Sequence, residues 1–347
     1  MPLIAVTGPV CAGKHTVADW LVQHHAFRRI ILQKSPKRDA SSSPTKRSPR
    51  TKEFSSIFSS VEDLIDYATR HWRENLVVTD ISLKSEYDAL SKRPFFLLVS
   101  VDAPLLTRWH RFRGRCVHLE EEVPTLEAFV EMSDSHFYGT ESSSHTTSSA
   151  AGLSTLGDLG HAAVFLKSSL RIMNIQKTVT DFHKHLEELD VVNQDRIRPS
   201  WDAYFMQLAS LASLRSNCMK RRVGCVLVRN KRVISTGYNG TPRGLTNCNE
   251  GGCSRCNSAS AGGVGLGTCL CLHAEENALL ESGRDRVGDE ATLYCNTCPC
   301  LTCSVKIAQV GVKEVIYNQA YSMDDESAKI LKQAGVVLRQ FSPPYED

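Results

Sequence analysis

The sequence predicts an α/β protein of two domains: a parallel α/β domain, followed by a three-layer α/β/α domain with a five-stranded mixed sheet. Its 347 residues are more than one domain usually holds. The first half contains largely continuous apolar runs, as parallel strands that are buried on both faces require. The second half alternates short β-rich runs with helix-like periods, an order that places helices on both faces of a sheet.

The composition is that of a soluble globular protein. Charged residues make up 23% of the chain and the net charge is only +3, so no nucleic-acid partner is predicted. No apolar run approaches the length of a membrane span, and the first residues lack the basic region of a signal peptide. Eleven of the 13 cysteines lie between Cys218 and Cys303, in CxxC and CxC spacings that favour metal thiolates over disulfides. We therefore expect a cytoplasmic protein that can also be nuclear, with no membrane partner.

The chain begins with a strand candidate, Leu3–Val6, that runs into a glycine-rich loop. Gly8, Gly13 and Lys14 form a GxxxxGK pattern, whose backbone amides and lysine can hold phosphates at a helix N-terminus. The loop resembles that of P-loop nucleotide kinases, but His15 stands where a hydroxyl would hold magnesium. A working kinase remains one alternative. The missing hydroxyl favours a degenerate, kinase-like domain that serves folding, assembly or nucleotide sensing.

Two polar stretches without apolar periodicity interrupt the first domain, and both are predicted to be disordered. We interpret the first as a solvated loop insertion, with phosphorylation of its Ser-Pro pairs or a nuclear address as alternatives. Between Leu186 and Arg198 a helix is expected to end and a linker to follow. The domains are placed at residues 1–190 and 198–341, the insertions at 34–52 and 139–151, and two further buried strands of the first domain at 75–81 and 95–101.

The second domain is expected to have the element order α-β-β-α-β-α-β-α-β. Its first helix has one apolar face, and its first two strands form a hairpin around the polar turn Asn230-Lys231. A Gly- and Cys-rich segment separates this hairpin from the rest. Helices are expected at 201–216, 273–282, 300–309 and 324–334, and strands at 223–229, 232–238, 291–295, 314–317 and 336–340.

A zinc site is the strongest chemical prediction. His273, Cys300 and Cys303 offer three ligands that zinc accepts readily, which leaves the fourth tetrahedral position for water. Glu275, two residues beyond the histidine, supplies a carboxylate that can take a proton from that water. HxE followed by PCxxC is the signature of zinc nucleobase deaminases. The sequence therefore predicts Glu275 as the catalytic residue beside a zinc ion.

With the segment Gly237-Tyr238-Asn239-Gly240-Thr241-Pro242-Arg243-Gly244, this signature makes residues 198–341 resemble the cytidine deaminase superfamily and, within it, the deoxycytidylate (dCMP) deaminases. The first domain resembles the kinase-like extension of the fungal members. The resemblance implies zinc-dependent hydrolysis of dCMP to dUMP and ammonia, which supplies dUMP for dTMP synthesis. It also implies a homo-oligomer, typically a hexamer, that is activated by dCTP and inhibited by dTTP, with Mg²⁺ accompanying these effectors.

The same resemblance implies which residues contact the substrate. Asn239 is expected to hydrogen-bond the sugar and the backbone of Ala274 to contact the base edge, although Asn239 could instead be a turn residue. Arg243 and Arg222 are candidates for the 5′-phosphate. Tyr321 follows a predicted strand and is equally consistent with a substrate contact and with core packing. The expected contacts are Tyr238, Asn239, Gly240, Arg243, Ala274 and Tyr321.

Six further cysteines lie in the Gly- and Cys-rich part of the second domain, which has little hydrophobic content to fold it. A zinc ion there would supply the missing folding energy, and some dCMP deaminases carry such a second, structural zinc. Six thiols compete for four places, so the ligand set stays open, and ordinary buried or free thiols are the alternative. The candidates are Cys218, Cys248, Cys253, Cys256, Cys269 and Cys271.

Two other kinds of protein share parts of this pattern. The tRNA adenosine deaminases and the riboflavin-pathway deaminases contain HAE…PCxxC, but the segment 237–244 and the long Cys-rich insertion argue against both. No basic RNA-binding stripe accompanies the second domain. A nucleotide-binding assembly module with an inactive zinc site is the other alternative, and the presence of every catalytic position opposes it.

Overall fold

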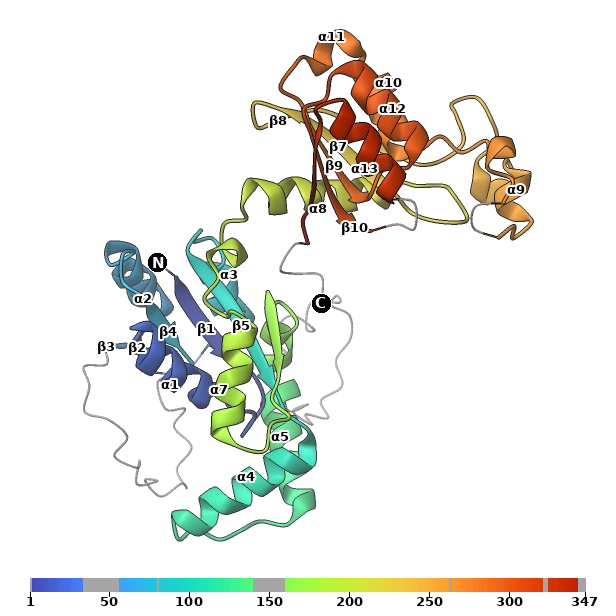
Figure 1. Cartoon of the computed structure of the whole chain (residues 1–347). Helices are drawn as coiled ribbons and strands as arrows, with labels where there is room; N and C mark the ends of the chain where they lie inside the picture. Colours follow the sequence, from blue (N-terminus) through green and yellow to red (C-terminus); the bar gives the residue numbers. More distant parts are fainter. Residues whose placement is uncertain are drawn as a thin grey trace, which may run out of the picture. The chain divides into compact units, whose positions relative to one another are not determined.

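The computed structural model describes residues 2–33, 56–79, 81–139, 160–261, 264–320 and 324–342 (Figure 1). The chain forms two compact units, Met1–Arg198 and Pro199–Asp347. The insertions predicted at 34–52 and 139–151 lie outside the described residues, apart from Gly139, and so does Tyr321.

A six-stranded sheet forms the middle layer of the first unit, in the order β3-β2-β4-β1-β5-β6. Every pairing in it is parallel, which confirms the predicted parallel α/β fold. The strands are β1 (Leu3–Thr7), β2 (Arg28–Leu32), β3 (Ser56–Phe58), β4 (Leu76–Val78), β5 (Phe96–Asp102) and β6 (Leu170–Met173). The helices are α1 (Lys14–His25), α2 (Val61–Arg70), α3 (Lys84–Leu90), α4 (Leu105–His118), α5 (Leu126–Tyr138), α6 (Gly160–Phe165) and α7 (Val179–Glu188), with a 3₁₀ turn at Gln194–Arg196.

Helices cover both faces of this sheet because its strands are apolar on both sides. On β1, Val6 packs in a core with α1 and α7, whereas Ala5 packs in a core with α2, α3 and α6 (Figure 1). The segment 191–197, predicted as a linker, joins the first of these cores. Val191 is fully buried there and Ile197 is partly buried, so this segment is part of the first unit.

A five-stranded sheet, in the order β11-β10-β9-β7-β8, forms the middle layer of the second unit. β7 pairs antiparallel with β8 and β9, whereas β9, β10 and β11 run parallel, so the predicted mixed sheet is confirmed. The strands are β7 (Gly224–Arg229), β8 (Arg232–Tyr238), β9 (Thr292–Thr297), β10 (Glu314–Gln319) and β11 (Val337–Gln340). The helices are α8 (Trp201–Ser213), α9 (Ser254–Asn257), α10 (Ala274–Ser282), α11 (Arg284–Val287), α12 (Leu301–Val310) and α13 (Asp324–Gln333), with 3₁₀ turns at Cys248–Glu250 and Leu266–Thr268.

The second unit has three layers because successive residues of a strand face opposite sides of the sheet. On β7, Val226 and Val228 pack in a core with Phe205 of α8. Leu227, between them, packs in the core that contains Ala278 of α10, together with residues of α12 and α13. Helix α8 therefore covers one face of the sheet, and α10, α12 and α13 cover the other (Figure 1).

The hairpin between β7 and β8 turns at Asn230 and Lys231, as the sequence predicts. Their φ angles of 51° and 60° lie in the left-handed region that two-residue hairpin loops favour. The hairpin places Tyr238, the last residue of β8, opposite Gly224 at the start of β7. The segment after β8 is thereby held at the edge of the sheet where the candidate active site lies.

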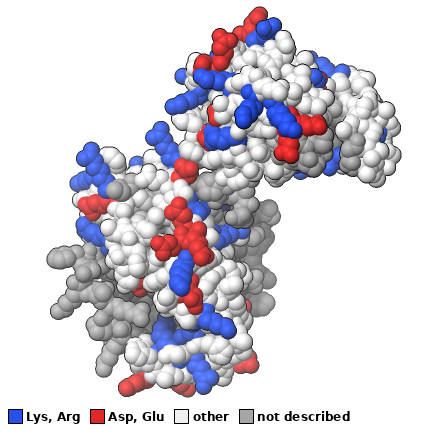
Figure 2. Space-filling model, viewed as in Figure 1, with Lys and Arg blue, Asp and Glu red and all other residues white. Residues whose placement is uncertain are grey.

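On the face shown in Figure 2, basic and acidic side chains are interspersed over both units, without an extended surface of one sign. Among the described residues, no helix combines the length and the apolar character needed to cross a membrane.

Candidate active site

Two helix N-termini carry the three predicted zinc ligands. His273 immediately precedes α10, and Cys300 immediately precedes α12, with Cys303 in the first turn of that helix. Ala274 of α10 and Ile307 of α12 are fully buried in the same core, so the two helices lie on one face of the sheet. Their first turns consequently meet, and the dipole of each helix favours an anionic thiolate there.

The ligand atoms converge at a distance that suits zinc. Nδ1 of His273 lies 3.3 Å from Sγ of Cys300 and 3.3 Å from Sγ of Cys303. All three ligand atoms lie within 4.8 Å of one another. Nitrogen and sulfur ligands at tetrahedral zinc are separated by about 3.5 Å, given the usual bond lengths. The residues present therefore fit a zinc ion held by one imidazole and two thiolates.

The two cysteine ligands differ in acidity. Hydrogen bonds from Cys303 and His273 lower the pKa of the Cys300 thiol to about 3. The hydrogen bond between the two thiols raises the pKa of Cys303, so Cys300 deprotonates first. The hydroxyl of Thr302 lies 3.1 Å from Sγ of Cys300 and can donate to that thiolate. A metal cation at this position favours deprotonation of both cysteines.

Glu275 is buried next to these ligands. Only 4% of its surface is exposed, and this burial raises the pKa of its carboxyl from the usual 4.5 to about 7. A proton acceptor and donor works best when its pKa lies near the working pH. The next residue, Glu276, differs in environment: its carboxylate forms a surface ion pair with Nζ of Lys306 at 2.6 Å.

Close packing at Gly237 sets the position of β8 relative to α10. A Cβ atom on Gly237 would lie 2.0 Å from the carbonyl oxygen of Ala274, so glycine is required for this approach. Nδ2 of Asn277, on α10, donates to the carbonyl oxygen of Tyr238 at 2.9 Å. These two contacts hold the turn that follows β8 beside the helix that carries Glu275.

Asn239 is buried, and its side-chain amide bonds to a neighbouring segment. Its Oδ1 accepts from the backbone N–H of Val223 at 2.8 Å and from the hydroxyl of Ser216 at 2.7 Å. Its Nδ2 donates to the carbonyl oxygen of Arg221 at 2.8 Å, its one acceptor among the described residues. Ser216 lies directly before Asn217-Cys218, yet no spacing in the sequence links it to Asn239, so the sequence analysis missed this role.

The other predicted substrate contacts occupy different environments. Gly240 exchanges backbone hydrogen bonds with Leu272, at 3.2 and 2.9 Å, which places the turn next to His273. Tyr238 is half-buried at the end of β8, whereas Arg243 is exposed. The structure thus brings Tyr238, Asn239 and Gly240 to the start of α10.

Comparison with known proteins places this geometry in a family. Residues 199–319 match the model of the cytidine and deoxycytidylate deaminase zinc-binding region. Over 344 residues the chain is 49% identical to a deoxycytidylate deaminase of Schizosaccharomyces pombe, a match that covers 99% of this chain and 98% of that protein. The chain belongs to the deoxycytidylate deaminase family. It is therefore an enzyme of the hydrolytic deaminase class, as the sequence predicts.

Two further deoxycytidylate deaminases show how the two units are distributed in this family. The Saccharomyces cerevisiae protein is 44% identical over 343 residues, covering 98% of this chain and 96% of that protein. The match therefore includes the first unit. The protein of Mycobacterium phage D29 is 44% identical over 126 residues, which is 35% of this chain but 95% of that protein. A deoxycytidylate deaminase can thus be much shorter than the two units together.

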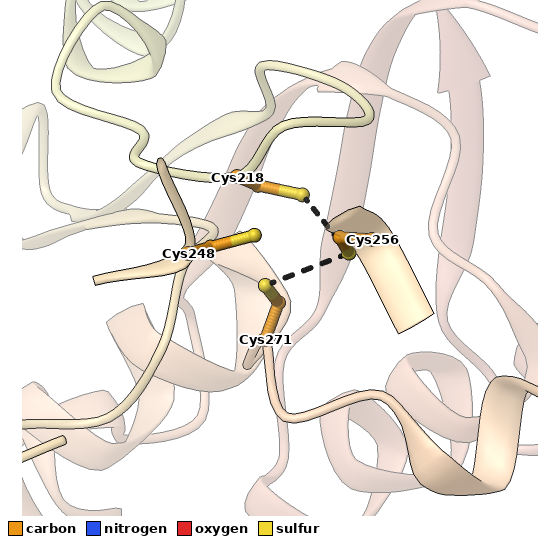
Figure 3. Close-up of side chains that lie close together, drawn as sticks. All are labelled: Cys218, Cys248, Cys256 and Cys271. Atoms are coloured by element: carbon orange, nitrogen blue, oxygen red, sulfur yellow. Dashed lines mark hydrogen bonds between the residues drawn. The ribbon is translucent and has the colours of Figure 1, made fainter. Parts of the chain in front are cut away.

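The candidate second metal site of this deoxycytidylate deaminase family member consists of six cysteines. These six lie together. Four of them, drawn in Figure 3, point their sulfur atoms toward a common centre. A second group of four shares two members with the first, so the structure does not reduce the six candidates to one set of four. The groups are Cys218, Cys248, Cys256 and Cys271, and Cys253, Cys256, Cys269 and Cys271.

The glycine-rich loop of the first unit connects β1 to α1. Nζ of Lys14 donates to the carbonyl oxygens of Gly8 and Pro9, at 2.7 and 3.0 Å, so the lysine folds back over the loop. Gly13 has a φ of 116°, a conformation that favours glycine. His15 is exposed in the first turn of α1. The lysine amino group thus contacts the carbonyl oxygens of its own loop, and an imidazole stands at the position expected for the hydroxyl.

Proposed function

We propose that this protein catalyses the zinc-dependent hydrolysis of dCMP to dUMP and ammonia. One observation carries the proposal: the convergence of Nδ1 of His273 with the sulfur atoms of Cys300 and Cys303, beside the buried carboxyl of Glu275. That arrangement has the donor set of a zinc site with an open fourth position and a proton carrier next to it. Its occurrence in a chain 49% identical to a deoxycytidylate deaminase supports dCMP as the substrate.

Glu275 moves the protons in this reaction. Zinc, when bound, lowers the pKa of a water molecule and so supplies a nucleophile at neutral pH. Glu275 would accept a proton from a water molecule whose oxygen adds to C4 of cytosine, and would deliver that proton to N3 of the ring. In a second transfer, the carboxylate takes the proton of the new C4 hydroxyl and delivers it to the 4-amino group, which leaves as ammonia while the C4–O bond becomes a carbonyl. Water and dCMP enter, and dUMP and ammonia leave.

The turn after β8 orients the nucleotide. The second N–H of the Asn239 amide can donate to a sugar hydroxyl, because its first is engaged by Arg221. The backbone of Ala274 meets the base edge, and Tyr238 and Gly240 flank the sugar. Arg243, being exposed, is available to pair with the 5′-phosphate. Tyr321 is proposed as a further contact by resemblance alone.

Family membership also supports a proposal about the setting of the reaction. The dUMP formed would feed dTMP synthesis, with activation by dCTP and inhibition by dTTP, each with Mg²⁺, in a homo-oligomer of hexameric type. We place the enzyme in the cytoplasm, with access to the nucleus. Measuring turnover against dCMP concentration, with each effector in turn and with the oligomer sized in parallel, tests these points. A turnover that neither effector changes would contradict the proposed regulation, and a monomer would contradict the proposed assembly.

The first unit is proposed to bind a phosphate group through Gly8, Gly13 and Lys14 without transferring it. The hard Mg²⁺ ion prefers oxygen ligands, and His15 offers nitrogen instead. Incubation with Mg²⁺, radiolabelled ATP and nucleoside monophosphates should leave all label on ATP. Efficient transfer that disappears in a Lys14→Ala variant would show that this unit is a second enzyme.

The test of the main proposal compares two adjacent glutamates. Loss of cytosine absorbance is followed with dCMP, CMP and cytidine. We expect dCMP to be the best substrate, and Glu275→Gln to keep its zinc but to lose at least about 10²–10⁴-fold in turnover, because an amide cannot shuttle protons. Glu276→Gln, which removes only a surface ion pair, should remain active. Near-normal turnover in zinc-loaded Glu275→Gln would refute the assigned role, and a preference for cytidine would refute the substrate.

A further inference from the structure

The six cysteines of the candidate second metal site are called here the cysteine cluster. Their geometry does not separate four metal ligands from two cysteines without a role. They form two groups of four in which all sulfur atoms lie within 4.8 Å of one another, and the groups have Cys256 and Cys271 in common. The first group is completed by Cys218 and Cys248, and the second by Cys253 and Cys269. Two tetrahedra that share an edge have this connectivity.

The distances between sulfur atoms agree with that description. Sγ of Cys256 lies 3.9 Å from Cys218, 3.8 Å from Cys269 and 3.9 Å from Cys271. Sγ of Cys253 lies 3.9 Å from Cys269. With zinc–sulfur bonds of about 2.3 Å, the edge of a tetrahedral tetrathiolate site is about 3.8 Å long. Cys256 therefore has sulfur neighbours at tetrahedral spacing in both groups at once (Figure 3 shows the first).

We propose that the cysteine cluster binds two zinc ions as a binuclear thiolate centre, in which Cys256 and Cys271 bridge the metals. Cys218 and Cys248 complete the coordination of one ion, and Cys253 and Cys269 that of the other. Six thiols release six protons and two divalent ions bind, so the centre carries a net charge of about −2. This proposal is independent of the proposed function.

The surroundings of the cysteine cluster contain little else that could hold the chain together. Among the residues that the structure describes, the core of this region consists of cysteine side chains. The larger apolar side chains nearby, Leu245, Val264, Leu266 and Leu270, are between 48% and 59% exposed. Without an apolar core, a loop-rich segment needs another source of folding free energy, and metal binding supplies it. A pair of metal ions ties together three separate stretches, around 218, 248–256 and 269–271.

Hydrogen-bond donors are placed to stabilise anionic sulfur. The backbone N–H of Met219 donates to Sγ of Cys248 at 3.4 Å, and that of Lys220 donates to Sγ of Cys218 at 3.5 Å. The backbone N–H of Leu270 donates to Sγ of Cys253 at 3.5 Å. Four of the six sulfurs are assigned to one metal ion only, without bridging. Three of these four accept a hydrogen bond from a backbone N–H, as the more negative, non-bridging thiolates of such a centre would.

Zinc content of the full-length protein tests the proposal. Elemental analysis should give about three zinc ions per chain, two in the cysteine cluster and one at His273, Cys300 and Cys303. The Cys253→Ala/Cys269→Ala variant should lose about one ion, because the first tetrahedron survives, and Cys256→Ala about two. Cys11→Ser, which changes a cysteine of the first unit, should keep all three. About two ions in the parent chain, with no loss in Cys253→Ala/Cys269→Ala, would overturn the binuclear centre in favour of a single structural zinc.

X-ray absorption at the zinc edge gives a readout that does not depend on how the variants fold. A bridged pair should produce a zinc–zinc scattering path in the parent protein, and this path should disappear in Cys253→Ala/Cys269→Ala. Absence of the path in parent protein that holds about three zinc ions would overturn the bridging role of Cys256 and Cys271.

Discussion

At the residue scale, the candidate active site depends on one position where a side chain is excluded. Gly237 allows β8 to approach the first turn of α10 so closely that a Cβ atom would overlap the carbonyl oxygen of Ala274. Glu275 and His273, the proposed proton carrier and a proposed zinc ligand, lie on either side of Ala274. A shift of the helix away from β8 would therefore displace the proton carrier and a metal ligand together.

Replacing this glycine should affect stability and activity alike. We expect Gly237→Ala to cost about 1–3 kcal/mol, since the helix or the strand must move, and to lower kcat more than the loss of folded protein explains. Gly114→Ala is the matched control, because its Cβ would meet no atom within 4 Å in the exposed part of α4. That substitution should stabilise the protein by about 0.5–1 kcal/mol. Thermal unfolding and turnover of both variants give the comparison, and equal behaviour of the two would contradict this account.

The candidate catalytic and metal-binding residues were predictable from the sequence, whereas the residues that position the site by hydrogen bonds were not. His273, Glu275, Cys300 and Cys303 could be found because ligand type and short spacing on helix starts are visible in the sequence. The hydrogen bond from Ser216 to Asn239 depends on how segments distant in the sequence pack together, and so does the division of the six cysteines into overlapping groups. No local sequence pattern encodes such contacts.

At the scale of elements, the carboxylate of Asp202 on α8 forms polar contacts with the sheet that this helix covers. The hydroxyl of Tyr294, on β9, donates to Oδ1 of Asp202 at 2.8 Å, and Arg339 of β11 contacts the other carboxylate oxygen at 2.8 Å. Burial, reinforced by this hydrogen bond, raises the pKa of Tyr294, so its phenol stays protonated at neutral pH. The contact joins residues 92 positions apart in the chain.

Removing the acceptor should destabilise the second unit. We expect Asp202→Ala to cost about 1–3 kcal/mol, because the buried Tyr294 hydroxyl loses its partner; the half-exposed Arg339 pair adds little. Asp289→Ala, at an exposed position, should change stability by less than about 0.5 kcal/mol. Adding Tyr294→Phe to Asp202→Ala should recover part of the loss, since the unpaired hydroxyl is then absent. Denaturant unfolding of the four proteins measures these effects, and a further loss in the double variant would contradict the assignment.

The elements of the second unit were more predictable than those of the first. The nine helices and strands expected for it occur in the predicted order among the described residues. In the first unit, β4 lies within the strand expected at 75–81, whereas β3 contains three residues, too few to show any period. The segment 191–197 is polar at several positions and therefore resembles a linker in the sequence, whereas in the structure Val191 is buried in the core.

At the scale of the whole molecule, each of the two units has cores of its own. The cores of the first unit draw on residues 3–197 and those of the second on residues 205–341, with no cluster containing members of both among the described residues. The phage D29 relative, at about a third of this length, agrees with a catalytic unit that is complete by itself.

Separation of the units should therefore leave deamination intact. We expect residues 199–347, expressed alone with zinc, to fold cooperatively and to convert dCMP within about 10-fold of the full-length rate. Circular dichroism and the absorbance assay provide the readouts, with Glu275→Gln in the same fragment as the inactive control. A folded fragment without activity would show that the first unit takes part in catalysis.

The strand order of the second unit has a consequence for biosynthesis. β9 lies in the middle of the sheet, but β10, which pairs with it, and β11, which pairs with β10, are the last strands among the described residues. During translation, the antiparallel part β8-β7-β9 and the starts of α10 and α12 leave the ribosome before that parallel edge has been made. All three proposed ligands of the candidate active site lie within residues 273–303, so a nascent chain that binds zinc as proposed can do so before β10 and β11 have joined the sheet.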